Sequence, residues 1–343
     1  MAEMLDFEEF KRRYQEVPVE EYPNRVQEAV PDPLLTVLLT TYNHADYIRK
    51  AIESVLMQEV DFPMEIVLGD DDSSDGTREI CIEYAEQHPD LIRLQLHHRE
   101  NNHRLYGRPT HLFQYWYNTL SARGKYIAPL SGDDYWTVSG KLQKQVSLLE
   151  QNTNYCFTHH NAKLKEKDGK KSKYFSVKRD EKLSPKKLRG APIVVASSAV
   201  FKNVFHSIPS EFMETIHEDR IVTSTLGRHG KGKFLSDIMS VYRKHGEGLF
   251  DTLSNRNVYL DKNKYLSIIS NKICESRQCK RSILKEKVNV SKEMLLKSLS
   301  EGQHVLSAKI ITETMFLLVL KIEIKKALGW FKTVTKYVFR NIV

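Results

Sequence analysis

Short apolar runs alternate with amphipathic segments between residues 34 and 136, and this alternation constrains the fold more than any other feature. The first run, LLTVLLTTYN at 34–43, is apolar and β-branched, as expected of a strand buried on both faces of a parallel sheet. The segment that follows, 44–58, has apolar residues spaced about 3.6 residues apart, which indicates a helix. The same signals predict further strands at 64–69, 91–98 and 124–136, and further helices at 76–88 and 107–122. This order predicts a doubly wound α/β sheet with right-handed crossovers.

Length and charge narrow the class of protein. The 343-residue chain is 41% hydrophobic, which suits one large α/β domain with an appendage, or two domains. Its net charge of +8 suits an anionic partner such as nucleic acid, a membrane surface or a phosphorylated small molecule. The four cysteines form no CxxC pair, and the N-terminus is charged where a signal peptide would be apolar. We therefore expect a cytoplasmic protein without structural disulfides.

Polar clusters follow three of the predicted strands, where the ligands of such sheets bind. The clusters are Thr40-Thr41-Tyr42-Asn43, Asp70-Asp71-Asp72 and Ser131-Gly132-Asp133-Asp134. Any one of them taken alone could be a helix cap or a turn, but three at one edge of a sheet favour a binding site. The sequence has neither a GxxxxGK[ST] phosphate loop nor a GxGxxG turn, so neither an NTPase nor a dehydrogenase is favoured.

With these motifs in order, residues 34 to about 150 resemble the nucleotide-sugar-binding half of a family 2 glycosyltransferase with the GT-A fold. The resemblance is carried by LLTTYN, GDDDSSDGT and GKYIAPLSGDDYW. It implies a Rossmann-like, mixed but mostly parallel sheet flanked by helices, with a C-terminal helical appendage. It also implies that Thr40, Tyr42 and Asn43 contact the nucleotide, and that Asp70 or Asp71 hydrogen-bonds the uracil or ribose of a UDP-sugar.

The second acidic cluster predicts a divalent cation. Asp133 and Asp134 would lie beside the diphosphate of the donor, and hard carboxylate and phosphate oxygens suit Mg²⁺ or Mn²⁺. Ser131 stands where many relatives have the first Asp of D-x-D, so we expect Asp133 to coordinate the ion directly, and Asp134 either to assist or to bind the sugar. In YRKHGEG, Arg243 suits the diphosphate and His245 is a further candidate metal ligand. The alternatives are an Asp-rich turn and a solvated basic loop.

The acceptor half is predicted from the resemblance. An E-D pair supplies the catalytic base in such enzymes, and Glu218 and Asp219 match it, with Asp219 as the base of an inverting transfer. An acidic first turn of a helix is the alternative. On the acceptor side we expect Ser197, Ser198 and Trp136.

The sequence divides into three predicted regions. A helical extension at 1–33 precedes a glycosyltransferase domain at 34–250, with a donor half at 34–150 and an acceptor half at 151–250, and a helical region follows at 251–343. The charged run 163–183 is expected to be an exposed hairpin or loop that does not bind nucleic acid. The apolar run 315–320 is far shorter than the roughly 20 residues that span a bilayer. The basic, aromatic tail after residue 310 is expected either to lie on an anionic membrane at the inner face or to pack on protein, including a second subunit.

The predicted function is an inverting, metal-dependent glycosyltransferase. It would move a sugar from a nucleotide-sugar donor, most simply a UDP-sugar, to a hydroxyl of a glycan, lipid-linked or protein-linked acceptor in cell-surface polysaccharide synthesis. The alternative of a different kind is an inactive protein of this fold that binds or scaffolds. A nucleotidyltransferase fits less well because its glycine-rich, basic N-terminal phosphate loop is missing.

Overall fold

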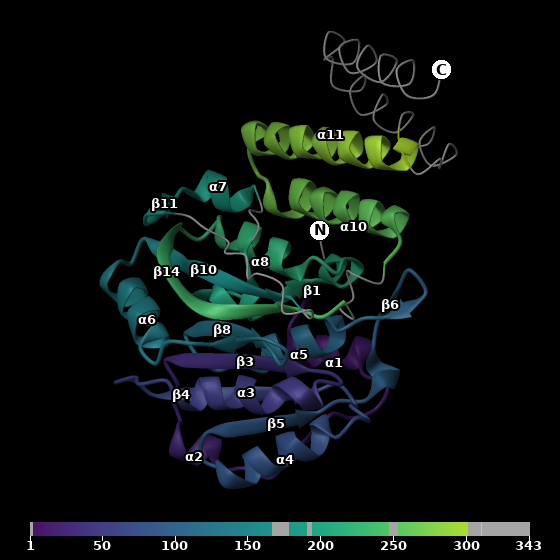
Figure 1. The fold of residues 1–343 in the computed structure, drawn as a ribbon. Helices are drawn as coiled ribbons and strands as arrows, with labels where there is room; N and C mark the ends of the chain where they lie inside the picture. The colour runs from purple at the N-terminus through teal and green to yellow at the C-terminus, as the bar shows by residue number, and fades with distance from the viewer. Residues whose placement is uncertain (1–2, 167–177, 191–193, 247–252, 301–309, 311–343) are drawn as a thin grey trace.

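A ten-stranded mixed sheet forms the centre of the molecule (Figure 1). The computed structural model describes residues 3–166, 178–190, 194–246, 253–300 and 310. In order across the sheet the strands are β11 (Glu181–Leu183), β14 (Lys231–Lys244), β10 (Tyr155–Glu166), β12 (Val200–Lys202), β8 (Tyr126–Ser131), β3 (Leu35–Thr41), β4 (Met64–Asp70), β5 (Ile92–Leu96) and β2 (Glu20–Glu21), while β9 (Tyr135–Trp136) pairs with β14. The predicted α/β class is confirmed.

The four strands β8, β3, β4 and β5 run parallel and are the ones that the apolar runs predict. Their side chains alternate between two cores: Leu38 faces one side of the sheet, and Val37 and Leu39 face the other. In the register, Thr41 pairs with Asp70, and Thr40 pairs with Ser131. The three polar clusters therefore begin at one level of the sheet.

Helices cover both faces of the sheet (Figure 1). One face carries α3 (Ala45–Leu56), α4 (Thr77–Gln87) and α6 (Lys141–Gln151). The other carries α1 (Phe7–Tyr14), α5 (Leu112–Ser121) and α8 (Glu218–Leu226). Between them the helices bury aliphatic and aromatic side chains against both sides of β3, which is why this strand needs no polar face.

The N-terminal extension contains short helices, as predicted, and also two short strands. Besides α1 and α2 (Val26–Ala29) it supplies β2 to the edge of the sheet and β1 (Met4–Leu5), which pairs with β13 (Ile208–Pro209). A two-residue strand is too short to show an alternating pattern in the sequence. It is a strand only because it pairs with a neighbouring strand.

The second half of the sheet is built around the parallel pair β10 and β14. β14 also pairs with β9, which follows β8 in the chain, so the last residues of β14 lie near the end of β8. Within 194–203 a 3₁₀ turn, η2 (Ala196–Ser198), precedes β12. The charged run 163–183 begins as the end of β10 and finishes as β11, while 167–177 lie outside the described residues.

Shorter elements connect these layers. They are η1 (Arg99–Asn101), the hairpin of β6 (Arg104–Leu105) and β7 (Arg108–Pro109), α7 (Pro185–Arg189) and η3 (Ser210–Glu214).

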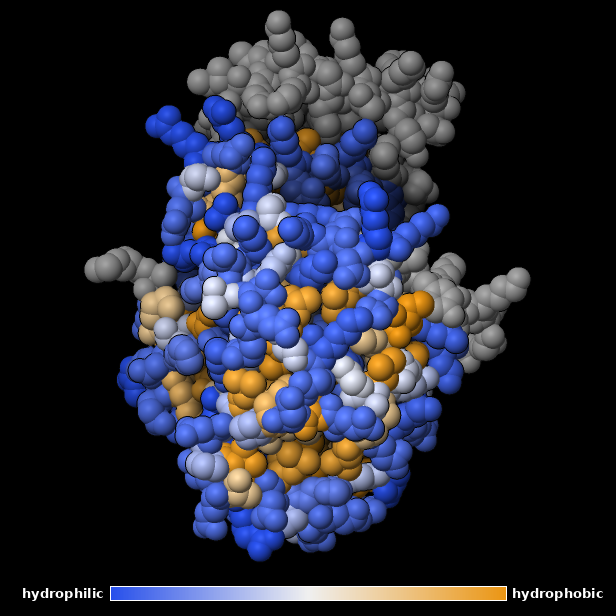
Figure 2. All heavy atoms as spheres, turned by 90° about the vertical axis from the view of Figure 1, so that its left-hand side faces the viewer, coloured by the Kyte–Doolittle hydropathy of each residue, from blue (hydrophilic) through white to orange (hydrophobic). Residues whose placement is uncertain are grey.

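The described part of the C-terminal region is helical, as predicted: it forms α10 (Asn255–Ile268) and α11 (Arg277–Ser300), joined through a π-helical turn, η4 (Ile269–Ile273). Leu266 and Ile283 belong to the same apolar core as Ile221 of α8. Both helices lie at one end of the molecule, which is mostly hydrophilic on the face that Figure 2 presents. Among the described residues we find no helix long and apolar enough to cross a membrane. The tail, 311–343, lies outside them.

One expectation about cysteines is wrong. Cys274 and Cys279 form a disulfide, because the turn between η4 and α11 brings their Cα atoms to 5.5 Å. A search for CxxC spacing does not detect a pair separated by five residues. Cys81 and Cys156 are free and buried.

Candidate active site

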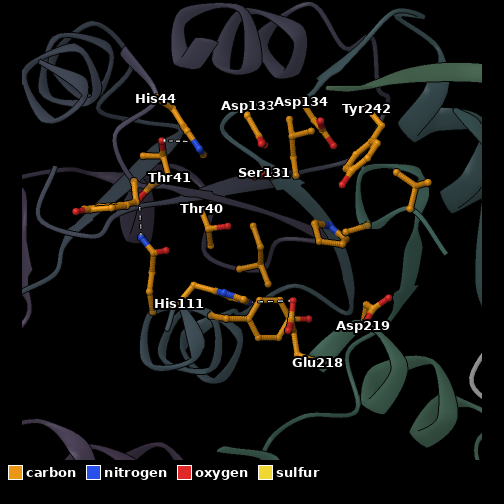
Figure 3. A pocket seen from close by; sticks show the side chains of 18 of the residues that line it. Thr40, Thr41, His44, His111, Ser131, Asp133, Asp134, Glu218, Asp219 and Tyr242 are labelled. Carbon is orange, nitrogen blue, oxygen red and sulfur yellow. Dashed lines mark hydrogen bonds and ion pairs between the residues drawn. The ribbon is translucent and has the colours of Figure 1, made fainter. Parts of the chain in front are cut away.

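A cavity of about 590 Å³ opens where the strand ends face the start of α8. The site has two parts. The strand-end edge comprises the polar clusters at 40–44, 70–72 and 131–134 together with His245; the first and last clusters and His245 contribute lining residues, whereas 70–72 adjoin the edge without lining the cavity. The helical side comprises His111, His217, Glu218 and Asp219. Figure 3 shows His44, Asp133 and Asp134 on one side of the cavity and His111, Glu218 and Asp219 across from them.

The strand-end edge contains a cluster with the geometry of a metal site. Ligand atoms of His44, Asp133 and His245 all lie within 4.8 Å of one another. Among the described residues, this is the group of His, Cys, Asp or Glu side chains that lie close enough together to hold a metal ion. His245 Nε2 lies 3.1 Å from Asp133 Oδ2. Burial raises the pKa of Asp133, but the His245 hydrogen bond and the charge of His44 more than reverse this, so the pKa lies below its usual value. Burial also lowers the pKa of His44, which favours the neutral imidazole that binds metals.

Two residues predicted for the metal and the diphosphate have other contacts. Asp134 lines the cavity, but its Oδ1 accepts the backbone N–H of Arg243 at 2.9 Å. Burial, and next the charge of Asp133, raise the pKa of Asp134 well above its usual value, so it is a poorer ligand than Asp133. The Arg243 guanidinium donates to the Asp133 carbonyl and lies over the rings of Tyr47 and Tyr135, at 5.0 and 4.5 Å from their centres.

Asp70 and Asp71 of the first aspartate cluster are buried, are held by arginines and are not among the residues that line the cavity. Asp70 accepts from Arg78 Nε at 2.7 Å, and Asp71 accepts from Arg99 Nη1 at 2.9 Å and Asn102 Nδ2 at 2.8 Å. Within the described chain, each of the two aspartates keeps a buried Oδ1 without a hydrogen-bond partner. Burial raises the pKa of Asp71 to about 6, even though Asn102 and Arg99 act against this shift. An unpartnered buried carboxylate oxygen suits a ligand that donates hydrogen bonds.

The TYN segment positions two of these groups. Thr40 and Tyr42 line the cavity, and the Arg99 guanidinium lies 3.9 Å from the centre of the Tyr42 ring, so Arg99 joins Tyr42 to Asp71. Asn43, in the left-handed region at φ 51°, accepts the backbone N–H of Ser74 at 3.0 Å. Asn43 thus connects two loops and does not line the cavity.

The helical side holds the acid pair at the start of α8, whose first residue is Glu218 as predicted. Glu218 Oε1 lies 3.1 Å from His111 Nε2. Burial alone would lower the pKa of His111, but the Glu218 charge outweighs burial and the pKa is raised, which favours an ion pair between the imidazolium and Glu218. Burial and the Glu218 charge raise the pKa of Asp219 to about 6, although Arg220 opposes the shift. Asp219 is therefore ionised at neutral pH yet basic enough to accept a proton.

The three residues predicted for the acceptor side lie behind the cavity wall. Ser197 and Ser198 are fully buried, and Trp136, 1% exposed, donates through Nε1 to the Ser197 carbonyl at 2.7 Å. The residues that line the cavity here are their neighbours 194–196. A role of the two serines or of Trp136 in direct acceptor contact stays a prediction.

Sequence reasoning missed three residues of the site. His44 directly follows TYN and was assigned to a helix start. His111 carries no motif and comes from α5, whose N-cap it forms. Arg99 lies in η1, after the third predicted strand. For His44 the signal was an imidazole next to a predicted nucleotide site, whereas His111 and Arg99 become recognisable only when the elements pack.

This fold and the strand-end edge define a glycosyltransferase of the GT-A class. Residues 36–207 match the model of Glycosyl transferase family 2, and the chain belongs to this family. An uncharacterized protein of Mycobacterium tuberculosis is 31% identical over 241 residues, 67% of this chain, and the match spans 63% of that relative's length.

Two further proteins are similar to this chain. The Escherichia coli protein named UDP-Glc:alpha-D-GlcNAc-diphosphoundecaprenol beta-1,3-glucosyltransferase WfgD is 31% identical over 133 residues, 39% of this chain and 47% of that protein. The structure of S. aureus TarS 1–349 in complex with UDP-GlcNAc superposes with a TM-score of 0.59 at 15% identity, covering 89% of this chain and 91% of TarS 1–349. The latter likeness supports the fold.

Proposed function

We propose that the chain is an inverting, metal-dependent glycosyltransferase that transfers a sugar from a nucleotide-sugar donor to an acceptor hydroxyl. The observation that carries the proposal is the arrangement across one cavity: the His44–Asp133–His245 cluster on one side and Asp219 on the other. An inverting displacement needs a leaving-group site and a base on opposite faces of the sugar.

The donor is a UDP-sugar in this proposal. The unpartnered oxygens of Asp70 and Asp71 suit the N–H and O–H donors of uracil and ribose, and Arg99 joins Asp71 to Tyr42, which lines the cavity. The names of two compared proteins support the choice, since one is a UDP-Glc glucosyltransferase and the other was solved with UDP-GlcNAc.

The residues present fit a divalent cation. One carboxylate and two imidazoles within reach of a single point can hold it together with diphosphate oxygens, and the imidazole nitrogens favour Mn²⁺ over Mg²⁺. When bound, such an ion neutralises charge on the departing nucleoside diphosphate. Asp133 and His245 hold each other in place through their 3.1 Å contact.

Asp219 serves as the base. The acceptor hydroxyl gives its proton to the Asp219 carboxylate while its oxygen bonds to the anomeric carbon, and the bond to the diphosphate breaks with the electron pair leaving on the nucleotide. Glu218 is paired with His111 and is therefore the less available of the two acids. Its charge keeps the pKa of Asp219 raised.

The test is a panel of nucleotide sugars, each measured for thermal stabilisation and for hydrolysis with Mn²⁺, with Mg²⁺ and with EDTA. We expect one donor to stabilise the protein and to be hydrolysed only with metal. Asp219→Asn is the matched control, since it should keep the stabilisation and lose the hydrolysis. Stabilisation without turnover in the wild-type protein would favour the inactive binding protein, and neither effect with any donor would overturn the proposal.

The acceptor and the location are further proposals. A lipid-linked or cell-surface glycan acceptor is supported by the E. coli relative, whose name describes transfer to a diphosphoundecaprenol-linked sugar. Attachment of the basic, aromatic tail to an anionic membrane rests on the sequence alone. Its test is co-sedimentation with anionic vesicles before and after truncation at residue 315.

A further inference from the structure

The helical side of the cavity is tied to the C-terminal helices through one buried carboxylate, Asp261 of α10. Asp261 has no solvent exposure. Its Oδ2 accepts from Thr215 Oγ1 at 2.7 Å and faces His217 Nδ1 at 2.5 Å, while its Oδ1 accepts from Tyr106 O–H at 3.0 Å and the Ile216 N–H at 3.3 Å. A buried carboxylate that accepts from this many donors fixes the position of each of them.

His217 is the member of this group that reaches the active site. It is the N-cap residue of α8, immediately before the acid pair, and it lines the cavity. Its ring packs on Tyr265 of α10, with the ring centres 4.7 Å apart. Because Nδ1 faces Asp261, the Nδ1 proton is held there, and both the tautomer and the ring orientation are set from outside the cavity.

The third donor to Asp261 comes from a strained turn. Tyr106 and Gly107 form the tip of the β6–β7 hairpin, and both have positive φ, 55° for the tyrosine and 78° for the glycine. An aromatic residue rarely adopts this conformation unless the surroundings hold it. Here the Tyr106 hydroxyl spans from the hairpin to α10, so the hairpin and the helix both fix Asp261.

We infer that Asp261 is a positioning residue for the transfer reaction: through His217 it fixes the start of α8, and with it the place of Asp219 at the acceptor. This inference rests on the proposed function of Asp219. The positioning role of Asp261 makes α10 part of the catalytic unit. Both α8 and α10 lie beyond residues 36–207, the part of the chain that matches the family model. The charged and titratable groups around His217 are Asp261 and Tyr265 of α10 and Asp219 and Arg220 of α8, and Tyr106 reaches the same carboxylate.

The decisive variant is Asp261→Asn, which keeps the shape and removes the charge. Turnover is measured as hydrolysis of the donor that the wild-type enzyme accepts in the panel. We expect kcat to fall about 10- to 100-fold, as for other residues that orient a catalytic group, with the donor KM within about twofold of wild type. His217→Gln should give a similar loss, and the double variant should lose little more than either single variant, because the two residues act as one unit.

Tyr259→Phe is the matched control. It lies on the same helix and removes a hydroxyl that contacts Ser291 of α11 at 3.4 Å, so it perturbs the packing of α10 without touching Asp261. We expect its kcat to be unchanged. If Asp261→Asn does not fold, His217→Gln carries the test by the same split between kcat and KM. Three results would overturn the inference. The first is an unchanged kcat in the folded Asp261→Asn and His217→Gln variants, and the second is an equal loss of kcat in Tyr259→Phe. The third is a double variant whose loss is the full sum of the two single losses.

A spectroscopic readout separates this inference from the proposed function. A proton shared between His217 Nδ1 and Asp261 at 2.5 Å should give a low-field NMR resonance that is present in the wild-type protein and lost in Asp261→Asn. If the panel finds no substrate but the resonance is present in the wild-type protein and absent in Asp261→Asn, the proposed function fails while the His217–Asp261 pairing stands. If turnover is found and the resonance is the same in both proteins, the positioning role is overturned.

Discussion

The strand-end edge and the helical side of the cavity are assembled in different ways. The strand-end edge uses residues that directly follow β3, β4 and β8, and the register of three adjacent parallel strands brings them to one level. The helical side draws His111 from α5, His217 to Asp219 from the start of α8, and its support, Asp261, from α10. The first is a property of the sheet, and the second depends on contacts between distant segments. Donor binding and acceptor activation should therefore be separable by mutation.

The largest effect is expected at the strand-end edge. Asp133→Ala removes the carboxylate of the three-residue cluster, so we expect transfer to become undetectable and the Mn²⁺-dependent part of UDP affinity to disappear. Turnover and calorimetric titration of UDP with and without EDTA measure this. Asp237→Ala is a matched control on β14, because Asp237 forms an exposed pair with Lys144 and should be neutral. Undiminished turnover of the wild-type enzyme in EDTA would contradict the prediction.

On the helical side, Asp219→Asn should separate chemistry from binding. We expect kcat to fall about 10²- to 10⁴-fold, the usual contribution of a general base, while the donor Kd stays within about twofold. Steady-state kinetics and donor titration measure the two quantities. Glu218→Gln should cost less, because Glu218 is paired with His111 and accepts no substrate proton in this mechanism. If the losses were reversed, Glu218 would be the base.

Asp71→Asn tests donor binding separately from the chemical step. Asp71 keeps one buried, unpartnered oxygen, and losing a charge-assisted hydrogen bond to the nucleotide should raise the donor KM about 10-fold with kcat nearly unchanged. The measurement is the donor dependence of the rate at fixed Mn²⁺. Asp72→Asn, on the neighbouring and more exposed carboxylate, is the matched control and should leave KM unchanged. A fall in kcat alone would place Asp71 in the chemistry and not in binding.

The smallest effect is a pH dependence. The pKa of Asp219 is raised to about 6, and only the ionised carboxylate can accept the proton. The value of kcat at saturating donor should therefore be constant above this pKa and fall about tenfold for each pH unit below it. Saturation is needed because the pKa of Asp71 is also raised to about 6 and would affect KM. A profile without an acid limb in the wild-type enzyme, or the same limb in Asp219→Asn, would contradict the assignment.

Much of the strand-end edge could be predicted because its signals are local. The parallel strands around residues 35–41, 64–70 and 126–131 are continuous apolar runs, and the clusters at the ends of the first and third of them line the cavity. The start of α8 at Glu218 was also predicted, from its acidic first turn and the family motif. His44 was missed although it adjoins TYN, because an imidazole becomes a candidate ligand only when a carboxylate lies within reach.

Burial could not be predicted from residue type. Ser197, Ser198 and Trp136 are polar or amphipathic residues that the fold places in its interior, where the Trp136 N–H is satisfied by a backbone carbonyl. Arg243 is likewise used to hold the Asp133 loop and two tyrosine rings. The disulfide depends on a turn whose geometry no spacing rule describes.

By itself the sequence determined the α/β class, the order of the parallel strands along the chain and the chemistry at their ends, because periodicity and strand-end polarity act over a few neighbouring residues. Only the tertiary structure decided which side chains meet. It brought His44 and His245 to Asp133, paired Glu218 with His111 and placed Asp261 beneath His217. These contacts join residues tens to hundreds of positions apart, and their geometry is set by how helices and strands pack, which no local pattern of residues encodes.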